Sequence, residues 1–318
     1  MTRPVSVVVP SLDDFDLLER DLPPLLDELA ARTQGDEVLV VDDTGKDVLS
    51  SRLAQSFPTV RVLARAENGG FARALTNGIE EARHELVFAM NPDVRVRRGF
   101  LDPLVASIQE EDVSAVVPRV LLGGDEEQIE SLTELAWKEG MVEIHQPGLS
   151  GGEEHGPGIV PVAFPIGGAC LLKRKDFLAS GGFDPLYEPF YWEDVDWGWR
   201  AWRAGKRILY QPASVVEHHH RGTIGRLIEK DVVRAAIERN RHLFPWKHLD
   251  DPEHLRAHLA ALYRLALDAF ALDRREELIW LDLALEDLER ALASRAREGR
   301  GERTFTEVLQ MTRPDESR

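Results

Sequence analysis

Residues 5–43 read VSVVVPSLDDFDLLERDLPPLLDELAARTQGDEVLVVDD. The stretch begins with a short run rich in β-branched residues, Val5 to Val9, which Pro10 ends, and it closes on a second apolar run, Val38 to Val41. Between the two runs, Leu17 to Ala31 has the apolar spacing of a helix. Continuous apolar strands separated by helices are typical of a parallel sheet that is covered on both faces.

The same alternation continues along the first third of the chain. Val60 to Leu63 and Leu86 to Met90 are two further apolar strands, and a helix starting near Gly70 lies between them. Ligands of open α/β sheets bind beyond the carboxyl ends of the strands. We therefore expect the site among the polar residues that follow the strands, which are Ser11 to Asp13, Asp42 to Asp43 and Asn91 to Asp93.

Composition excludes several classes of protein. The formal charge of -17 argues against nucleic acid as a main partner, because phosphate-backbone binding needs a basic surface. The single cysteine, Cys170, rules out an intramolecular disulfide and fits a reducing compartment. Residues 1–4 show no signal-peptide pattern, and no apolar run reaches the ~20 residues of a membrane helix. We expect a cytoplasmic protein without a transmembrane segment, with peripheral membrane contact left open.

The nucleotide motifs with glycine-rich loops are absent from the sequence. The turn after the first strand, Val9 to Asp13, contains no glycine, and no G-x-x-x-x-G-K-[ST] motif is present. Acidic residues after separate strands instead favour a nucleotide diphosphate bridged by a divalent cation, Mg²⁺ or Mn²⁺. A second polar cluster, with three carboxylates between Glu193 and Asp196 and the histidines His218 to His220, suits a site that binds a metal and abstracts a proton.

These segments together resemble family 2 glycosyltransferases, which are inverting enzymes with a GT-A fold. The resemblance covers roughly residues 4 to 245, and its Asn-Gly-Gly-Phe and Asn-Pro-Asp forms are most similar to the rhamnosyltransferase-like branch. The matched segments are Val7 to Ser11, Val40 to Asp43, Glu67 to Ala74 with Asn77 and Gly78, Asn91 to Val94, Gly181 to Asp184, Trp192 to Asp196 and Pro212 to His218.

The resemblance implies a role for individual residues on the donor side. Asp42 would lie near the nucleotide base. Asp93 matches the last position of the family's D-x-D metal motif, whose first position here is Asn91, a weaker ligand than a carboxylate. His218 matches the histidine that contacts the metal or the diphosphate, although His219 or His220 could take its place. The donor site would be formed by Pro10, Ser11, Asp42, Asn68, Asn91 and Gly168.

The acceptor side centres on one carboxylate. The family's catalytic base lies in its Glu-Asp motif, which assigns that role to Asp194. Inversion is a direct displacement in which a carboxylate takes the proton of the attacking hydroxyl, and such help contributes about 10²–10⁴-fold. Trp192 and Glu193 would lie on the acceptor side, with Trp192 offering a stacking face to a sugar.

Structural explanations compete with these roles. Asp42 and Asp43 could be turn residues at a strand end. Glu193 and Asp196 could serve the first turn of a helix, with Arg200 and Arg203 as their ion-pair partners on one face. The tryptophans of this segment are expected to lie mostly in the hydrophobic core.

The resemblance divides the chain into domains. Residues 1–245 would form the GT-A domain, with a nucleotide-binding half (1–120) and an acceptor or catalytic half (121–245). Residues 246–318 would form a helical appendage, whose leucine stripes suit core packing or a homo-oligomer. The charged residues after Glu298 are expected to be disordered.

The function implied is transfer of a sugar, with dTDP-rhamnose as one candidate, from a nucleotide-diphosphate sugar to a glycan or lipid-linked acceptor in cell-surface polysaccharide synthesis. Two alternatives stay open. A nucleotidyltransferase shares the acidic α/β site, although it usually carries a glycine- and basic-rich loop after the first strand. A non-catalytic sugar-nucleotide-binding or scaffold protein is the other alternative.

Overall fold

The computed structural model describes residues 3–123, 125–147, 158–219 and 229–312. The strands are β1 (Val5–Ser11), β2 (Glu37–Asp42), β3 (Arg61–Ala64), β4 (Leu86–Met90), β5 (Val94–Val96), β6 (Val113–Leu122), β7 (Asp125–Ile129), β8 (Glu134–Lys138), β9 (Met141–His145), β10 (Val160–Pro161), β11 (Ala169–Lys173) and β12 (Arg207–His218). The helices are α1 (Phe15–Arg32), α2 (Ser50–Ser56), α3 (Gly70–Glu81), α4 (Leu101–Ser107), α5 (Arg174–Ala179), the 3-10 helix η1 (Pro185–Tyr187), α6 (Glu193–Arg203), α8 (Lys230–His248), α9 (Pro252–Ala271), α10 (Arg275–Glu286), α11 (Leu288–Glu298) and α12 (Phe305–Thr312).

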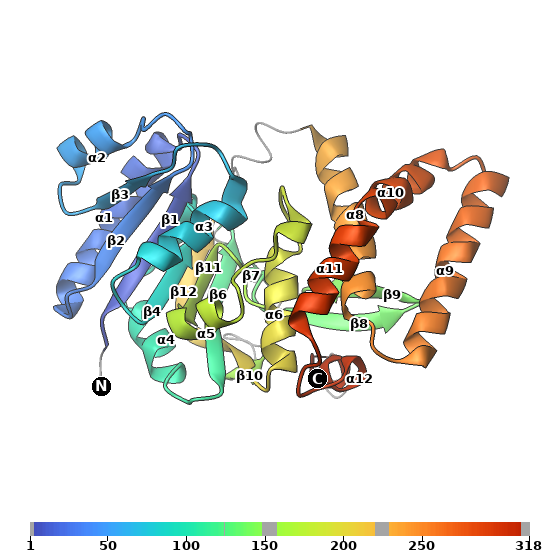
Figure 1. Cartoon of the computed structure of the whole chain (residues 1–318). Coiled ribbons are helices and arrows are strands. Elements are labelled where there is room, and N and C mark those ends of the chain that lie inside the picture. The colour runs from blue at the N-terminus through green and yellow to red at the C-terminus, as the bar shows by residue number, and fades with distance from the viewer. Residues whose placement is uncertain (1–2, 124, 148–157, 220–228, 313–318) are drawn as a thin grey trace.

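One mixed sheet organises the molecule, with strand order β10-β12-β6-β11-β4-β1-β2-β3. β4, β1, β2 and β3 pair in parallel, and β12 is parallel to β6. β11 runs antiparallel to both of its neighbours, β4 and β6. Helices flank the sheet, and the C-terminal helices gather beside α6 (Figure 1). The predicted α/β fold with a mostly parallel, helix-flanked sheet is confirmed.

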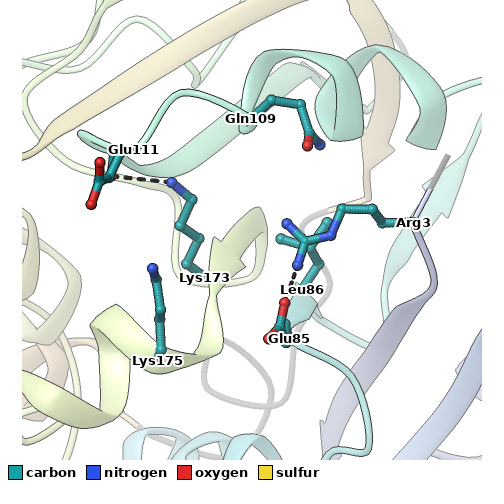
Figure 2. Close-up of a pocket in the computed structure, with 7 residues that line it drawn as sticks. All are labelled: Arg3, Glu85, Leu86, Gln109, Glu111, Lys173 and Lys175. Atoms are coloured by element: carbon teal, nitrogen blue, oxygen red, sulfur yellow. Dashed lines mark hydrogen bonds and ion pairs between the residues drawn. The ribbon is translucent and has the colours of Figure 1, made fainter. Parts of the chain in front are cut away.

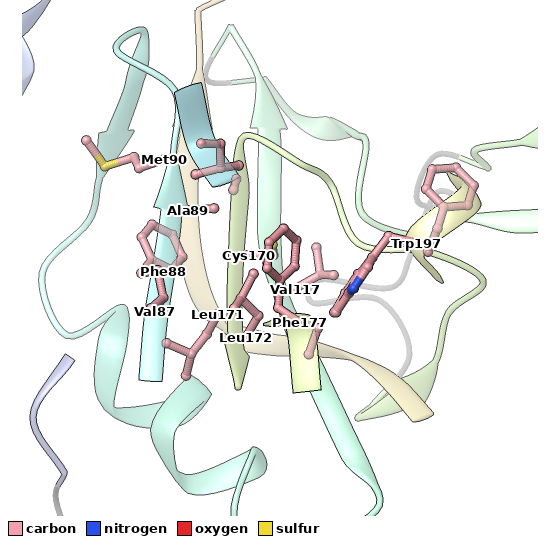
Figure 3. Packing of buried hydrophobic residues seen from close by; sticks show 14 of the residues in the cluster. Val87, Phe88, Ala89, Met90, Val117, Cys170, Leu171, Leu172, Phe177 and Trp197 are labelled. Atoms are coloured by element: carbon pink, nitrogen blue, oxygen red, sulfur yellow. The ribbon is translucent and has the colours of Figure 1, made fainter. Parts of the chain in front are cut away.

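The central strands are apolar throughout because both of their faces are covered. All seven residues of β1 and all five of β4 are buried, as expected for strands that lie between two layers of helices. Figure 3 shows the centre of this core, where side chains of β4 and β11 lie near Phe177 and Trp197. The rings of Phe177 and Trp197 pack with their centroids 5.5 Å apart.

The strand pairing brings distant segments to one edge of the sheet. β1, β2 and β4 end at Ser11, Asp42 and Met90, and they end at the same edge because they are parallel. β12 reaches this edge from the other half of the chain and pairs with β5, so that His218 lies opposite Val94. The residue before Val94 is Asp93, which explains how two residues 125 positions apart come to lie together.

The C-terminal helices begin earlier and end later than predicted. α8 starts at Lys230, so position 245, the predicted end of the catalytic domain, lies inside a helix. Residues 305–312 form α12, whose Phe305, Val308 and Leu309 are buried. These three residues have the i, i+3, i+4 spacing of one helical face, and the charged residues around them hide that pattern. The predicted disorder after Glu298 is therefore wrong for this segment, while residues 313–318 lie outside the described range.

Candidate active site

The loop after β4 lies against a glycine pair that precedes β11. The Asn91 backbone N–H donates to the Gly168 carbonyl oxygen at 2.8 Å. A Cβ atom added to Gly168 would lie 2.3 Å from the Asn91 side chain, so no other residue fits there without a shift. Glycine at position 168 thus permits a close approach between two loops, and its predicted contact with a donor stays a prediction.

Asp93 and His218 face each other across this edge of the sheet. His218 Nε2 lies 3.3 Å from Asp93 Oδ1, and its Nδ1 lies 2.9 Å from Glu130 Oε2. Burial lowers the pKa of the His218 imidazole, but the hydrogen bonds to Asp93 and Glu130 outweigh it and raise the pKa to about 9. Glu130, which follows β7, was not identified from the sequence, because nothing local marks it as a partner of a histidine 88 residues later.

The Asp93–His218 pair has the chemistry of a divalent metal site. A carboxylate oxygen and an imidazole nitrogen are both accepted ligands of Mn²⁺, and metal-binding histidines usually donate their other ring N–H to a carboxylate, as Glu130 provides here. These residues therefore fit the predicted cation, whose binding would displace the proton that the imidazole now holds. His219 pairs with Glu217 at 3.5 Å, and His220 lies outside the described residues.

Asp194 lies on the other side of the glycine pair. α6 begins at Glu193, so the predicted helix start is confirmed. Asp194 Oδ2 accepts the Gly167 N–H at 3.2 Å, and Oδ1 accepts the Val195 N–H at 2.8 Å. Since Gly168 contacts Asn91 and Gly167 contacts Asp194, two adjacent glycines join the donor side of the predicted site to its acceptor side.

The two carboxyl groups at the start of α6 differ in hydrogen bonding. Burial raises the pKa of Glu193, and the neighbouring Asp194 charge raises it further. Burial also raises the pKa of Asp194, but the backbone N–H groups of Gly167 and Val195 stabilise its ionised form. Glu193 Oε2 is buried and has no hydrogen-bond partner among the described residues. We conclude that Asp194 is the ionised member of the pair at neutral pH and Glu193 the protonated one.

Trp192 is a core residue. It is 4% exposed, and its ring lies 5.3 Å from that of Phe244 on α8, which leaves little surface for a sugar. Tyr191, one residue earlier, is 39% exposed. Burial raises the pKa of Tyr191, and the charges of Glu193 and Asp194 add to the effect, so the phenol lies near both carboxylates. Of these two aromatic residues, the structure leaves Tyr191 rather than Trp192 open to a ligand.

The predicted base-binding residue, Asp42, is fully buried and bonded within its own loop. Its Oδ1 accepts from the Thr44 N–H at 3.0 Å and from the Thr44 hydroxyl at 2.6 Å, and its Oδ2 accepts from the Leu49 N–H at 2.9 Å. This arrangement matches the turn role that was the structural alternative. A contact between Asp42 and a nucleotide base stays a prediction.

The remaining donor-side residues surround the same edge. Pro10 and Ser11 end β1 and are buried, and Ser11 Oγ accepts the Asp14 N–H at 3.3 Å. Asn68 is exposed, and its Oδ1 accepts the Gly70 N–H at 3.1 Å just before α3. The structure leaves the side chain of Asn68 accessible and those of Pro10 and Ser11 mostly covered.

Asp43 organises the loop that carries Asn68. Its carboxylate accepts the N–H groups of Gly69 (3.0 Å) and Gly70 (2.8 Å) and pairs with Arg65. Sequence reasoning noted the Asp42–Asp43 pair but assigned no separate role to its second member.

Asp196 has a structural role, in agreement with the alternative proposed from the sequence. It pairs with Arg200 at 2.7 Å, as predicted, whereas Arg203 pairs with Asp250 and not with the acids of α6. Asp196 also lies close to His248 and Glu298 in a group with metal-ligand spacing. The Lys247 ammonium lies 2.6 Å from Asp196 and already supplies the positive charge there.

A separate cavity of about 240 Å³ lies at the opposite edge of the sheet (Figure 2). Arg3 precedes β1, Leu86 begins β4 and Lys173 ends the antiparallel β11, so these lining residues mark the amino ends of the parallel strands. Arg3 pairs with Glu85, and Lys173 Nζ donates to the Glu110 carbonyl oxygen at 2.5 Å. Because these cations have internal partners, we assign this cavity no part in the reaction.

Comparison with known families and proteins agrees with the geometry. The model of the family described as "Glycosyl transferase family 2" matches residues 6–178. A "Pre-mycofactocin glycosyltransferase" of Mycobacterium tuberculosis is 28% identical over 69% of this chain, which spans 43% of that relative. An "N-acetylglucosaminyl-diphospho-decaprenol L-rhamnosyltransferase" of the same organism is 26% identical over 71% of this chain and 79% of its own length.

Two solved structures share the fold. One is GalNAc-T7 with UDP, GalNAc and Mn²⁺, which has a TM-score of 0.62 and 19% identity and is matched over 78% of this chain and 48% of its own. The other is a mannosyltransferase from Pyrobaculum calidifontis in complex with GDP-Man and Mn²⁺, with a TM-score of 0.56, 19% identity and coverage of 94% and 87%. At this level of identity the likeness concerns the fold.

Proposed function

The chain belongs to glycosyl transferase family 2, and we propose that it transfers a sugar with inversion from a nucleotide-diphosphate sugar to a hydroxyl of a glycan or lipid-linked acceptor. The observation that carries this proposal is the glycine pair, which joins Asp194 to the Asn91–Asp93 loop. A base and a metal site then lie on either side of one reaction centre. Displacement at an anomeric carbon needs both, because a proton leaves the acceptor while negative charge develops on the departing diphosphate.

Asp194 is the proposed general base. Its ionised form is held by two backbone N–H groups, which fix the carboxylate without supplying a cation that would lower its proton affinity. Burial makes it a better base than an exposed aspartate. The protonated Glu193 next to it is the proposed acceptor-side partner, although its Oε2 is buried in this structure and has no hydrogen-bond partner among the described residues.

Asp93 and His218 are the proposed ligands of Mg²⁺ or Mn²⁺. When bound, such a cation would stabilise the charge of the leaving diphosphate as a Lewis acid. Asn91 adds an amide oxygen at the same loop, and the carboxylate of Glu130 holds the imidazole in orientation. Support for the cation also comes from the two structural neighbours, which were solved with Mn²⁺.

dTDP-rhamnose is the donor that we favour. The observations supporting it are the Asn-Gly-Gly-Phe and Asn-Pro-Asp forms of the loops and the similarity to a rhamnosyltransferase over most of that protein's length. The same relative carries a lipid diphosphate in its name, which supports a lipid-linked acceptor and a place in cell-surface polysaccharide synthesis. The nucleotide would be bound among Pro10, Ser11, Asp42, Asn68, Asn91 and Gly168.

Contact with a membrane or with a second copy would involve α9. This helix exposes an apolar stripe, in which Leu259, Tyr263, Leu267 and Phe270 are each more than half exposed. None of the helices in the described part of the chain combines the length and apolarity needed to span a bilayer. Vesicle sedimentation tests binding of this face to a membrane, and the solution mass of the protein tests binding to a second copy. A cytoplasmic location stays a prediction.

The decisive experiment is a thermal-shift series with UDP-, GDP- and dTDP-sugars, each with and without Mn²⁺. A ligand that binds the native state raises the melting temperature by mass action. We expect a shift with one nucleotide class that depends on Mn²⁺ and that is lost in Asp93→Asn. If none of the donors shifts the melting temperature, the non-catalytic scaffold would be favoured.

The nucleotidyltransferase alternative has less support. Such an enzyme would need cationic groups on the loop after β1 to bind a triphosphate, and residues 11–14 of this chain are Ser, Leu, Asp and Asp. Incubation with a nucleoside triphosphate and a sugar phosphate tests it directly, and pyrophosphate release would overturn our preference.

A further inference from the structure

The loop that leads into the proposed base has an unusual backbone. Tyr191 and Trp192 have φ values of 67° and 75°, which lie in the left-handed region. Residues with a side chain rarely adopt this conformation, and it persists where the surrounding structure enforces it. Two such residues in succession precede Glu193 and Asp194, so their conformation sets where α6 begins and where Asp194 points.

Helix α8 supports this loop through one side chain. Asn240 is 0% exposed, and its Nδ2 donates to the carbonyl oxygens of Tyr187, Phe190 and Tyr191 at 3.0, 3.1 and 2.8 Å. Three carbonyl groups of a short loop thus converge on one amide group. A buried carbonyl without a donor is costly, so the loop conformation depends on this nitrogen.

Arg239 fixes the orientation of that amide. Its Nε and Nη2 donate to Asn240 Oδ1 at 3.0 and 2.8 Å, which keeps the oxygen away from the loop carbonyls. The same guanidinium also donates to the Glu188 carbonyl oxygen. The Arg239–Asn240 pair therefore presents donors, and only donors, to residues 187–191.

We propose that Asn240 is a positioning residue for catalysis. It acts through the loop: its hydrogen bonds hold Tyr191 and Trp192 in the left-handed conformation, which starts α6 at Glu193 and places Asp194 against Gly167. Asn240 lies on α8, outside the region that the family model matches, and its hydrogen bonds go to Arg239 and to the loop at residues 187–191. The expected effect of Asn240 on turnover rests on the proposed function, whereas its expected effect on the loop conformation does not.

A purely structural role would give a different result. If Asn240 only attached α8 to the rest of the molecule, its loss would lower stability and leave turnover by the folded protein unchanged. If it positions Asp194, its loss lowers kcat while donor binding persists, because the donor-side residues lie on other loops. Misplacement of a catalytic group by about 1 Å is enough to reduce the rate about 100-fold.

The test uses Asn240→Leu, which has the same branched shape and no charge but cannot donate. Leu243→Ala is the matched control, since it opens a cavity on the same helix without removing a hydrogen bond to the loop. Nucleoside diphosphate release from UDP-, GDP- and dTDP-sugars is measured against pH, together with donor affinity and amide hydrogen exchange at residues 190–194. For Asn240→Leu we expect a kcat about 10- to 100-fold lower and a donor affinity within about threefold of wild type. We also expect a displaced acid limb of the kcat profile and faster exchange in the loop.

Two results would overturn the proposal. One is an unchanged kcat and pH profile in Asn240→Leu; the other is exchange at Tyr191 to Asp194 as slow as in the wild type. The exchange measurement needs no donor, so it decides the inference even if the wild type turns over none of the three sugars, which would count against the proposed function instead. Should Asn240→Leu fail to fold, Arg239→Met releases the amide without removing it, and we expect the same pattern with a smaller loss of kcat.

Discussion

Two carboxylates of helix α6, only two residues apart, have opposite surroundings. Asp196 contacts three basic side chains, with Lys247 at 2.6 Å, Arg200 at 2.7 Å and His248 at 2.8 Å. Asp194 accepts backbone N–H groups from the Gly167 loop and from its own helix. Asp196 is fully buried and Asp194 partly buried; burial raises the pKa of Asp194, whereas Lys247 and Arg200 outweigh burial and hold the pKa of Asp196 well below its usual range.

The comparison separates a proposed chemical role from a structural one. A carboxylate surrounded by cations gives up its proton readily and has little tendency to take one from a sugar hydroxyl. A buried carboxylate without a cation has a higher proton affinity and suits a general base. Position in the first turn of α6 does not decide between these roles, because the cations that distinguish them come mainly from α8.

The largest effect is expected from Asp194→Asn. Loss of the general base should lower kcat about 10²–10⁴-fold, while donor affinity is retained because the donor-side residues are untouched. The melting temperature should change little, because the single oxygen of asparagine keeps one of the two N–H bonds and the substitution removes a partly buried charge. Steady-state turnover and calorimetric donor binding measure the two quantities. Equal turnover by mutant and wild type would contradict the assignment.

Lys247→Met probes the surroundings of Asp196 and should lower the stability of the fold. The change leaves Asp196, Asp184 and Glu298 without their shared ammonium, and breaking a buried ion network of this kind costs about 3–5 kcal/mol. Chemical unfolding measures this loss in the free energy of unfolding. Lys138→Met is the matched control: Lys138 is 63% exposed and lies 3.6 Å from Glu143, so its loss should cost less than about 1 kcal/mol.

If Lys247→Met instead lowered kcat of the folded protein as much as Asp194→Asn does, the separation of roles along α6 would fail. Turnover per folded molecule, with the folded fraction taken from the unfolding curve, distinguishes a catalytic loss from a loss of native protein.

The pH dependence of kcat should show the raised pKa of Asp194. A general base works when it is ionised, so activity falls as pH drops through its pKa. Because burial raises that pKa, the acid limb should lie above pH ~3.9, the value for an exposed aspartate. A limb at or below that pH would mean that the base has a cation beside it, as Asp196 has.

Glu193→Gln should have the smallest effect. Burial raises the pKa of Glu193, so its carboxyl is protonated at neutral pH, and glutamine retains a hydrogen-bond donor of similar size. We expect kcat within about threefold of wild type and an acid limb that stays in place. A loss comparable with that of Asp194→Asn would show that the two carboxyls exchange roles.

Much of the fold could be predicted from the sequence because its signals are local. The runs Val5 to Val9 and Val38 to Val41 are buried on both faces, and parallel strands with that pattern need helices on each side. The same reasoning failed at α12, where Phe305, Val308 and Leu309 are too few, among charged neighbours, to reveal a buried face.

The site was predicted less completely because its partners are distant in sequence. The resemblance to a family pointed to Asp93, Asp194 and His218, and the structure brings Asp93 and His218 together through the pairing of β12 with β5. Glu130 and Asn240 were missed, since each acts on residues about 50 to 90 positions away and has no motif of its own. Trp192 drew attention as an aromatic residue beside the acids, but packing against α8 covers it.

The most direct test of the account is the same substitution at both positions, Asp194→Asn and Asp196→Asn, measured for turnover per folded molecule and for melting temperature. We predict a crossed result: Asp194→Asn loses about 10²–10⁴-fold in kcat with little change in melting temperature, and Asp196→Asn melts lower with kcat within about tenfold of wild type. Loss of turnover in Asp196→Asn with full activity in Asp194→Asn would contradict it.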